Sequence, residues 1–83
     1  MTWQAFLTHE AEKNLKKLPA NIIERVKDAI REISINPLTG KPLKGNLKGQ
    51  YSFRLGDYRI VYIPEERKHC IFVLYIRHRR DAY

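Results

Sequence analysis

The chain has 83 residues, enough for one small domain that buries roughly 60–65% of its unfolded surface, and too few for two. Hydrophobic residues make up 43% of the sequence and charged residues 30%, a globular composition that argues against a disordered chain. The formal net charge is +7, and its excess lies in residues 41–83, where ten Lys/Arg face four Asp/Glu. Such an asymmetry favours a polyanionic partner, either nucleic acid or an acidic protein.

The first half of the sequence predicts one strand and two helices. Residues 2–8 alternate weakly between apolar and polar types and are expected to form a strand that is partly buried on both faces. Thr8 is placed to cap a short helix that Pro19 closes. Residues 20–35 carry one apolar stripe at helical spacing and predict a second helix, antiparallel to the first.

The second half predicts a loop and three strands. Residues 36–49 are rich in Pro, Gly and Lys and read as a loop, and strands are expected at about 50–55, 58–63 and 70–76. Gly56-Asp57 is a tight hairpin connection, so consecutive strands must run antiparallel. The fold class is therefore α+β, in the order strand-helix-helix-strand-strand-strand, with an antiparallel sheet backed on one face by the N-terminal helical hairpin.

Basic residues gather where the predicted strands end. Arg54 shares a strand face with Ser52, Arg59 follows the tight turn, and residues 77–80 read Arg-His-Arg-Arg after an apolar strand. If the turns are tight, Arg54, Arg59 and this tail meet on the face that the helices leave open, although Val61 would share the face of Arg59. Arginine binds phosphate with two hydrogen bonds at once, so RNA is the first candidate ligand.

The remaining titratable residues indicate neither a metal site nor an extracellular protein. His9 and His69 have no companions at ligand spacing, so no metal or other cofactor is expected. The single Cys70 cannot form an internal disulfide, and neither a signal-peptide pattern nor a membrane-spanning run is visible. We therefore expect a cytoplasmic protein that does not enter the membrane.

Two motifs resemble those of a known protein family. Arg54-Leu55-Gly56-Asp57-Tyr58-Arg59-Ile60-Val61-Tyr62 is similar to the core motif of the RelE/ParE superfamily of type II toxins. His78-Arg79-Arg80-Asp81-Ala82-Tyr83 is similar to the C-terminal motif of its RelE branch, and the proline- and lysine-containing loop at 36–49 also matches the family. The resemblance covers nearly the whole chain, in length and in the order of elements.

The resemblance implies a toxin of a toxin–antitoxin pair with a fold like that of small microbial ribonucleases. RelE-like members enter the A site of the small ribosomal subunit and cleave the mRNA there. The implied partners are a RelB-like antitoxin, the ribosome and mRNA. The toxin alone is expected to be a monomer and its antitoxin complex a hetero-oligomer.

The resemblance also implies roles for individual residues. Arg79 and Arg59 match arginines that contact the scissile phosphate, and Arg54 stands where some members carry lysine. Tyr83 matches a tyrosine that stacks on a base or orients the 2′-hydroxyl, and His78 is a candidate acid or base. Further RNA contacts are expected from Arg77, Arg80, Lys41, Lys44 and Lys48.

Each of these residues also has a purely structural interpretation. Arg79, Arg54 and the loop lysines could be solvated surface residues, Arg59 could form a structural ion pair, and Tyr83 could anchor the tail. Ser52 departs from the family, since the best-known member has a basic residue there. Two other functions remain open: a ParE-like toxin that binds gyrase without nuclease activity, and an inactive module that only binds RNA or an antitoxin.

Overall fold

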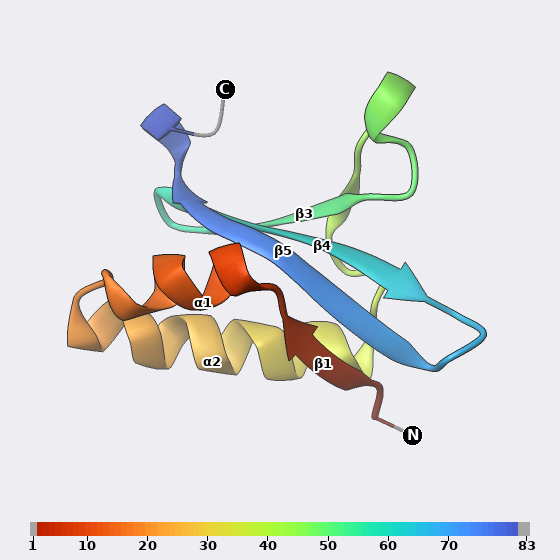
Figure 1. Cartoon of the computed structure of the whole chain (residues 1–83), viewed down its shortest axis with the longest axis horizontal. Helices are drawn as coiled ribbons and strands as arrows, with labels where there is room; N and C mark the ends of the chain where they lie inside the picture. The colour runs from red at the N-terminus through yellow and green to blue at the C-terminus, as the bar shows by residue number, and fades with distance from the viewer. Residues whose placement is uncertain (1, 82–83) are drawn as a thin grey trace.

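The structure, a computed structural model, describes residues 2–81 of the chain. Two helices and a five-stranded sheet form two layers, with the helices together on one side of the sheet (Figure 1). In chain order the elements are β1 (Gln4–Leu7), α1 (His9–Lys16), α2 (Ala20–Ile35), β2 (Lys41–Pro42), the 3-10 helix η1 (Gly45–Leu47), β3 (Tyr51–Leu55), β4 (Tyr58–Glu65), β5 (Cys70–His78) and the 3-10 helix η2 (Arg79–Asp81).

The α+β class is confirmed, but the sheet is mixed rather than wholly antiparallel. Its strand order is β1-β5-β4-β3-β2, and β3, β4 and β5 pair antiparallel as the short connections require. The prediction was wrong for β1, which pairs parallel with β5. It also missed β2, a two-residue strand within the predicted loop that pairs with β3. Two residues without alternation leave no periodic pattern to detect.

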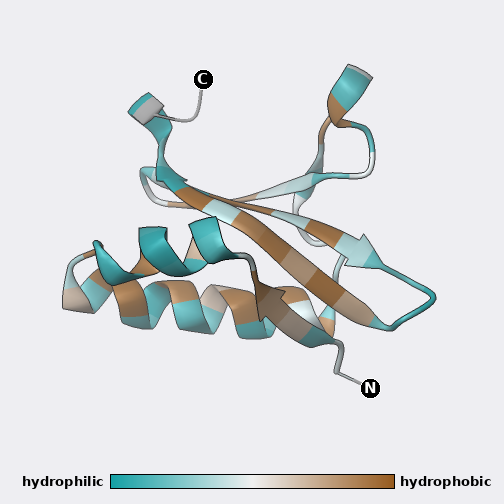
Figure 2. Ribbon diagram, in the orientation of Figure 1, coloured by the Kyte–Doolittle hydropathy of each residue, from teal (hydrophilic) through white to brown (hydrophobic). Residues whose placement is uncertain are grey.

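The core lies between the helices and one face of the central strands. Val26, Ala29 and Ile33 of α2 are buried and face Ile60 and Tyr62 of β4, which are also buried. Figure 2 shows the corresponding apolar colouring along α2, β4 and β5, with hydrophilic residues at η1 and η2 on the far side of the sheet. Since alternate strand residues point to opposite faces, burial of Ile60 directs its neighbours in β4, including the preceding arginine, away from the helices.

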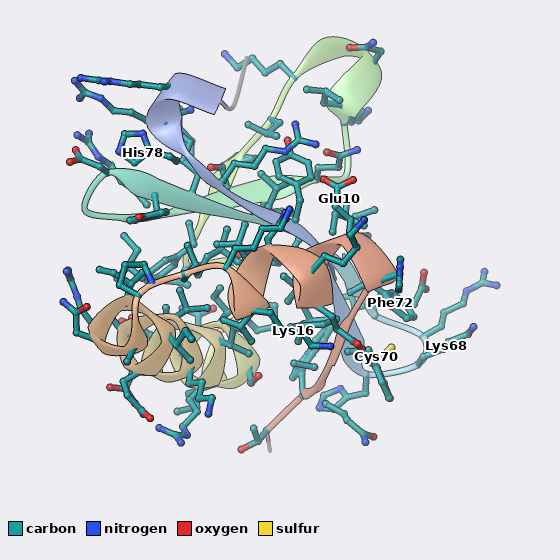
Figure 3. The ribbon with its side chains drawn as sticks, turned by 60° about the vertical axis from the view of Figure 1, so that its left-hand side comes forward. Glu10, Lys16, Lys68, Cys70, Phe72 and His78 are labelled. Carbon is teal, nitrogen blue, oxygen red and sulfur yellow. The ribbon has the colours of Figure 1, made fainter. Side chains whose placement is uncertain are left out.

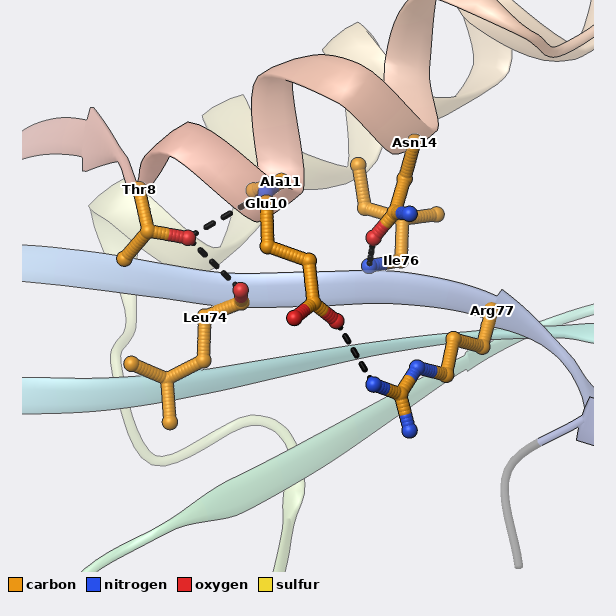
Figure 4. A network of polar contacts seen from close by, with 7 residues as sticks. All are labelled: Thr8, Glu10, Ala11, Asn14, Leu74, Ile76 and Arg77. Carbon is orange, nitrogen blue, oxygen red and sulfur yellow. Dashed lines mark hydrogen bonds and ion pairs between the residues drawn. The ribbon is translucent and has the colours of Figure 1, made fainter.

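Helix α1 closes the edge of β5 that β1 leaves unpaired. Thr8 caps α1 as predicted, because its Oγ1 accepts a hydrogen bond from the Ala11 N–H at 3.2 Å. The same hydroxyl donates to the Leu74 carbonyl at 2.6 Å, and the Asn14 Oδ1 accepts from the Ile76 N–H at 2.9 Å (Figure 4). Side chains of α1 therefore continue the hydrogen bonding of β5 beyond the end of β1, which prevents an exposed strand edge.

A buried tyrosine fixes the loop that follows α2. The Tyr62 hydroxyl donates to the Pro37 carbonyl at 2.8 Å and accepts from the Gly40 N–H at 2.9 Å. Burial raises the pKa of the Tyr62 phenol, although the Gly40 N–H acts in the opposite direction. A Cβ at Gly40 would lie 2.6 Å from the Tyr62 hydroxyl, so only glycine allows this approach. The contact holds the start of β2, and with it the lysine-bearing segment, against the sheet.

Candidate nucleic-acid interface

Three arginines form a row across the sheet face opposite the helices. Arg54 of β3 is directly opposite Arg59 of β4, and Arg59 is directly opposite Arg77 of β5. Directly opposed residues of antiparallel strands have their side chains on the same face, with Cβ atoms about 5 Å apart. We call Arg54, Arg59 and Arg77 the arginine row.

The like charges of the arginine row repel one another across the strands. Like charges directly opposite one another on a sheet are destabilising. Glu10 brings one carboxylate to the row, where it forms an ion pair with Arg77 at the end of the row. A cluster of like charges that faces away from the core is typical of a binding site for an anion, and guanidinium groups match phosphate geometry.

Arg77 is held at the end of the row by two contacts. Its Nη2 donates to the Glu10 Oε2 at 2.6 Å (Figure 4). Its guanidinium also lies 4.1 Å from the centroid of the Tyr75 ring. The Arg77 and Glu10 side chains are 37% and 51% exposed, so the ion pair contributes at most about 1 kcal/mol to stability. Its main effect is to fix the position of the Arg77 guanidinium.

The C-terminal segment is attached to the turn between β3 and β4. The Arg79 N–H donates to the Asp57 carbonyl at 2.6 Å, so η2 starts beside the turn that separates Arg54 from Arg59. Arg79 and the residue after it, also an arginine, are both exposed. The group of arginines that meet therefore differs from the predicted one. Strand register places Arg77 in the row with Arg54 and Arg59, and Arg79 lies next to the row at the same end of the sheet.

His78 lies at the end of β5, where the strand leads into η2 (Figure 3), and on the other face of the sheet from the row. His78 is directly opposite Tyr58. Because Tyr58 alternates with Arg59, both Tyr58 and His78 point to the helix side of the sheet, and their rings meet edge to face with their centroids 5.3 Å apart. The His78 Nδ1 accepts a hydrogen bond from the Arg80 N–H at 3.3 Å. Because β5 alternates regularly here, the structure does not bring His78 to the arginine row. Tyr83 lies outside the described residues.

The predicted loop lysines divide between the row and a separate pocket. Lys41 is directly opposite Ser52, which shares its face with Arg54, so Lys41 extends the basic face across β2. Lys44 and Lys48 flank η1 and line a pocket of about 500 Å³ together with a tyrosine of β3. In Figure 1, η1 and η2 both rise from the side of the sheet that the helices leave open.

Other parts of the surface fit phosphate less well. A pocket of about 470 Å³ at the opposite end, lined by Trp3, Leu38, Tyr51 and Pro64, has no Lys or Arg in its lining. Within residues 2–81, no group of three His, Cys, Asp or Glu could hold a metal ion. No helix in this part of the chain is long and apolar enough to cross a membrane.

Two residues of this interface are not predicted by the sequence. Glu10 has the pattern of a solvated helix residue, and no local pattern connects it to Arg77, which is 67 residues away in the chain. Tyr75 belongs to an apolar run that indicates a fully buried strand. It lies on the open face because it alternates with the core residue Ile76, and strict alternation along the strand is the signal that could have identified it.

Comparisons with known proteins agree with this architecture. Residues 5–83 match the model of a family described as the ParE toxin of the type II toxin–antitoxin system parDE. Toxin RelG of Mycobacterium tuberculosis is 35% identical over 85 aligned residues, covering 100% of this chain and 98% of the relative. Toxin RelE of the same organism is 34% identical, covering 93% of this chain and 81% of the relative.

Solved structures of toxin–antitoxin complexes contain the same fold. A chain of the RelBE2 complex of M. tuberculosis superposes with a TM-score of 0.87 at 32% identity, covering 94% of this chain and 99% of that one. In the archaeal RelE–RelB complex of Pyrococcus horikoshii the TM-score is 0.78 at 25% identity, with 99% and 100% covered. Family match, identity and fold lead to one conclusion: the chain belongs to the RelE/ParE superfamily of type II toxins, as a RelE-like member.

Proposed function

We propose that this toxin is a ribosome-dependent endoribonuclease that cleaves mRNA in the A site and so stops translation. The arginine row is the observation that carries the proposal. It offers three guanidinium groups on one open face, at a cost in stability that an anionic ligand offsets. Guanidinium groups on one face suit successive phosphates of an RNA strand.

The row suits the transition state of RNA cleavage. The 2′-hydroxyl loses its proton to water as its oxygen attacks the adjacent phosphorus, the P–O5′ bond breaks to leave a 2′,3′-cyclic phosphate, and the 5′-oxygen takes up a proton from water. Negative charge builds up on the phosphorane between these steps, and fixed cations stabilise it most in that state. We assign Arg54, Arg59 and Arg77 to the scissile phosphate and Arg79 to a contact beside it, and we propose no acid or base among residues 2–81.

A RelB-like antitoxin is the proposed partner in the cytoplasm. The structural relatives from M. tuberculosis and P. horikoshii are complexes of a RelE-type chain with a RelB-type chain. A basic toxin of net charge +7 favours an acidic segment that covers the arginine row and excludes RNA from it. Co-expression with the neighbouring reading frame should then restore growth.

The decisive experiment is primer extension on a message translated in a cell-free system to which the toxin is added. New cuts are expected in register with the codons, and only when the message is being translated. Arg77→Ala should remove most cleavage, whereas Arg67→Ala, an exposed arginine in the β4–β5 turn, should not. Intact messages in the presence of folded toxin would contradict the proposal, and a DNA-damage response in cells would then indicate a gyrase-directed toxin.

A further inference from the structure

A second cationic pocket lies behind the sheet, where α1 and β5 end. Its volume is about 370 Å³, and its polar lining comes from Asn14 and Lys17 of the α1 end, Tyr58 of β4, and Arg77 and His78 of β5. No carboxylate is among its lining residues. The pocket adjoins the arginine row, because Arg77, a member of the row, also lines the pocket.

The hydrogen bonds around this pocket leave several donors available to a ligand. The Asn14 Oδ1 is used by the Ile76 N–H, so the Asn14 amide group retains its two N–H donors. Alternate residues of a strand direct their N–H groups to the same edge, so the His78 N–H points toward the α1 side as the Ile76 N–H does. The His78 Nδ1 accepts from Arg80, which makes Nε2 the nitrogen that carries the proton in the neutral ring.

Charge and packing distinguish this pocket from an ordinary surface hollow. Lys17 supplies an exposed ammonium group, while Glu10 partly neutralises Arg77. The edge-to-face contact with Tyr58 fixes the His78 ring. Donors from a side-chain amide, a backbone amide, an imidazole and an ammonium therefore surround one space, and a phosphate oxyanion can accept from all of them.

We propose that this pocket binds a backbone phosphate of the RNA strand, next to the phosphate held by the arginine row. This inference rests on the proposed function, because it requires RNA as the ligand. An RNA strand that passes around the end of β5 meets the row on one face and Lys17 with His78 on the other. The pocket then acts as a second anchor that sets the direction of the strand across the row.

The test is binding of a short single-stranded RNA with 2′-O-methyl riboses, which cannot be cleaved, measured by fluorescence anisotropy at several salt concentrations. Removing one phosphate contact to a single strand lowers the slope of log K against log salt by about 0.7, equivalent to roughly fivefold weaker binding at 0.1 M salt. Lys17→Ala should show this decrease. Lys16→Ala removes an equally exposed charge from the preceding position, which does not line the pocket, and should leave the slope unchanged.

Because this assay needs no cleavage, it separates the two proposals. RNA binding by the wild type with equal slopes for the Lys17 and Lys16 variants would overturn the pocket alone. Wild-type protein that does not bind RNA at all would overturn the pocket, whereas codon-register cuts in translated messages would still support the ribosome-dependent nuclease. The expected slope change together with no cleavage on ribosomes would support the pocket and contradict only the nuclease. Lys17→Arg, which keeps the charge, should restore the wild-type slope.

Discussion

Neutralising one member of the arginine row should make the protein more stable and less active at the same time. Arg54→Gln removes the charge at the outer end of the row and keeps a polar side chain of moderate length. Arg54 is exposed, and its Nε makes a 3.5 Å contact with the Gly56 carbonyl. It also lines a pocket with Asp28 and Glu32 of α2, but it forms no ion pair within 4.0 Å with either carboxylate, so the substitution removes little attraction. The substitution also removes the repulsion from Arg59, directly opposite on β4.

The size of this repulsion follows from the geometry of the row. Side chains that start about 5 Å apart can spread their charges to roughly 7 Å, where two unit charges in water repel by about 0.6 kcal/mol. Screening at physiological salt reduces this by about half, and Arg77 adds a smaller contribution from one strand further. We therefore expect a gain of about 0.3–0.5 kcal/mol in the free energy of unfolding, or roughly 1–4 °C in the melting temperature of a domain of this size.

Thermal unfolding by circular dichroism at low and high salt measures the gain, and primer extension on a translated message measures activity. Arg54→Lys serves as the control, because it retains the charge and should leave the melting temperature close to that of the wild type. The gain of Arg54→Gln should shrink at 1 M salt, where the Debye length falls to about 3 Å. A lower melting temperature for Arg54→Gln, or undiminished cleavage, would refute the claim that stability is exchanged for phosphate binding at this position.

Three further predictions concern contacts that support the interface. Tyr62→Phe should lower the free energy of unfolding by about 2–3 kcal/mol, because both the Pro37 carbonyl and the Gly40 N–H lose their partner. Chemical denaturation measures this change, and a decrease below about 0.5 kcal/mol would contradict the prediction. Burial raises the pKa of Tyr62, so above pH 10 the unfolded chain releases the phenol proton more readily than the folded chain. As the pH rises above 10, the free energy of unfolding of the wild type should therefore fall by up to about 1.4 kcal/mol per pH unit more than that of Tyr62→Phe. Parallel plots of the free energy of unfolding against pH for the two proteins would be inconsistent with this prediction. Glu10→Gln should change the free energy of unfolding by no more than about 1 kcal/mol. It should slow single-turnover cleavage about 3- to 10-fold without weakening RNA binding, because Arg77 loses the group that positions it. An unchanged cleavage rate would count against that role of Glu10.

Much of the fold could be predicted because local patterns specify it. The apolar stripe of 20–35 predicts helix α2 with its observed bounds, and residue type and position identify Thr8 as the cap of α1. The two-residue turn at Gly56-Asp57 fixes the β3–β4 register, so the pairing of Arg54 with Arg59 follows from the sequence alone. The toxin family was predicted from motifs in these same segments, and the family match and the relatives confirmed it. The functional roles of the site residues stay predictions.

The remaining features depend on contacts between distant parts of the chain. The sequence by itself determined the helices, the antiparallel hairpins and the excess of positive charge at their ends, because periodicity, capping and turn chemistry act over a few residues. Only the tertiary structure decided that β1 lies parallel beside β5, that α1 brings Glu10 to Arg77, and that Arg77 and His78 serve opposite faces. These arrangements depend on how the helical layer packs against the sheet, and packing joins residues that no local pattern relates.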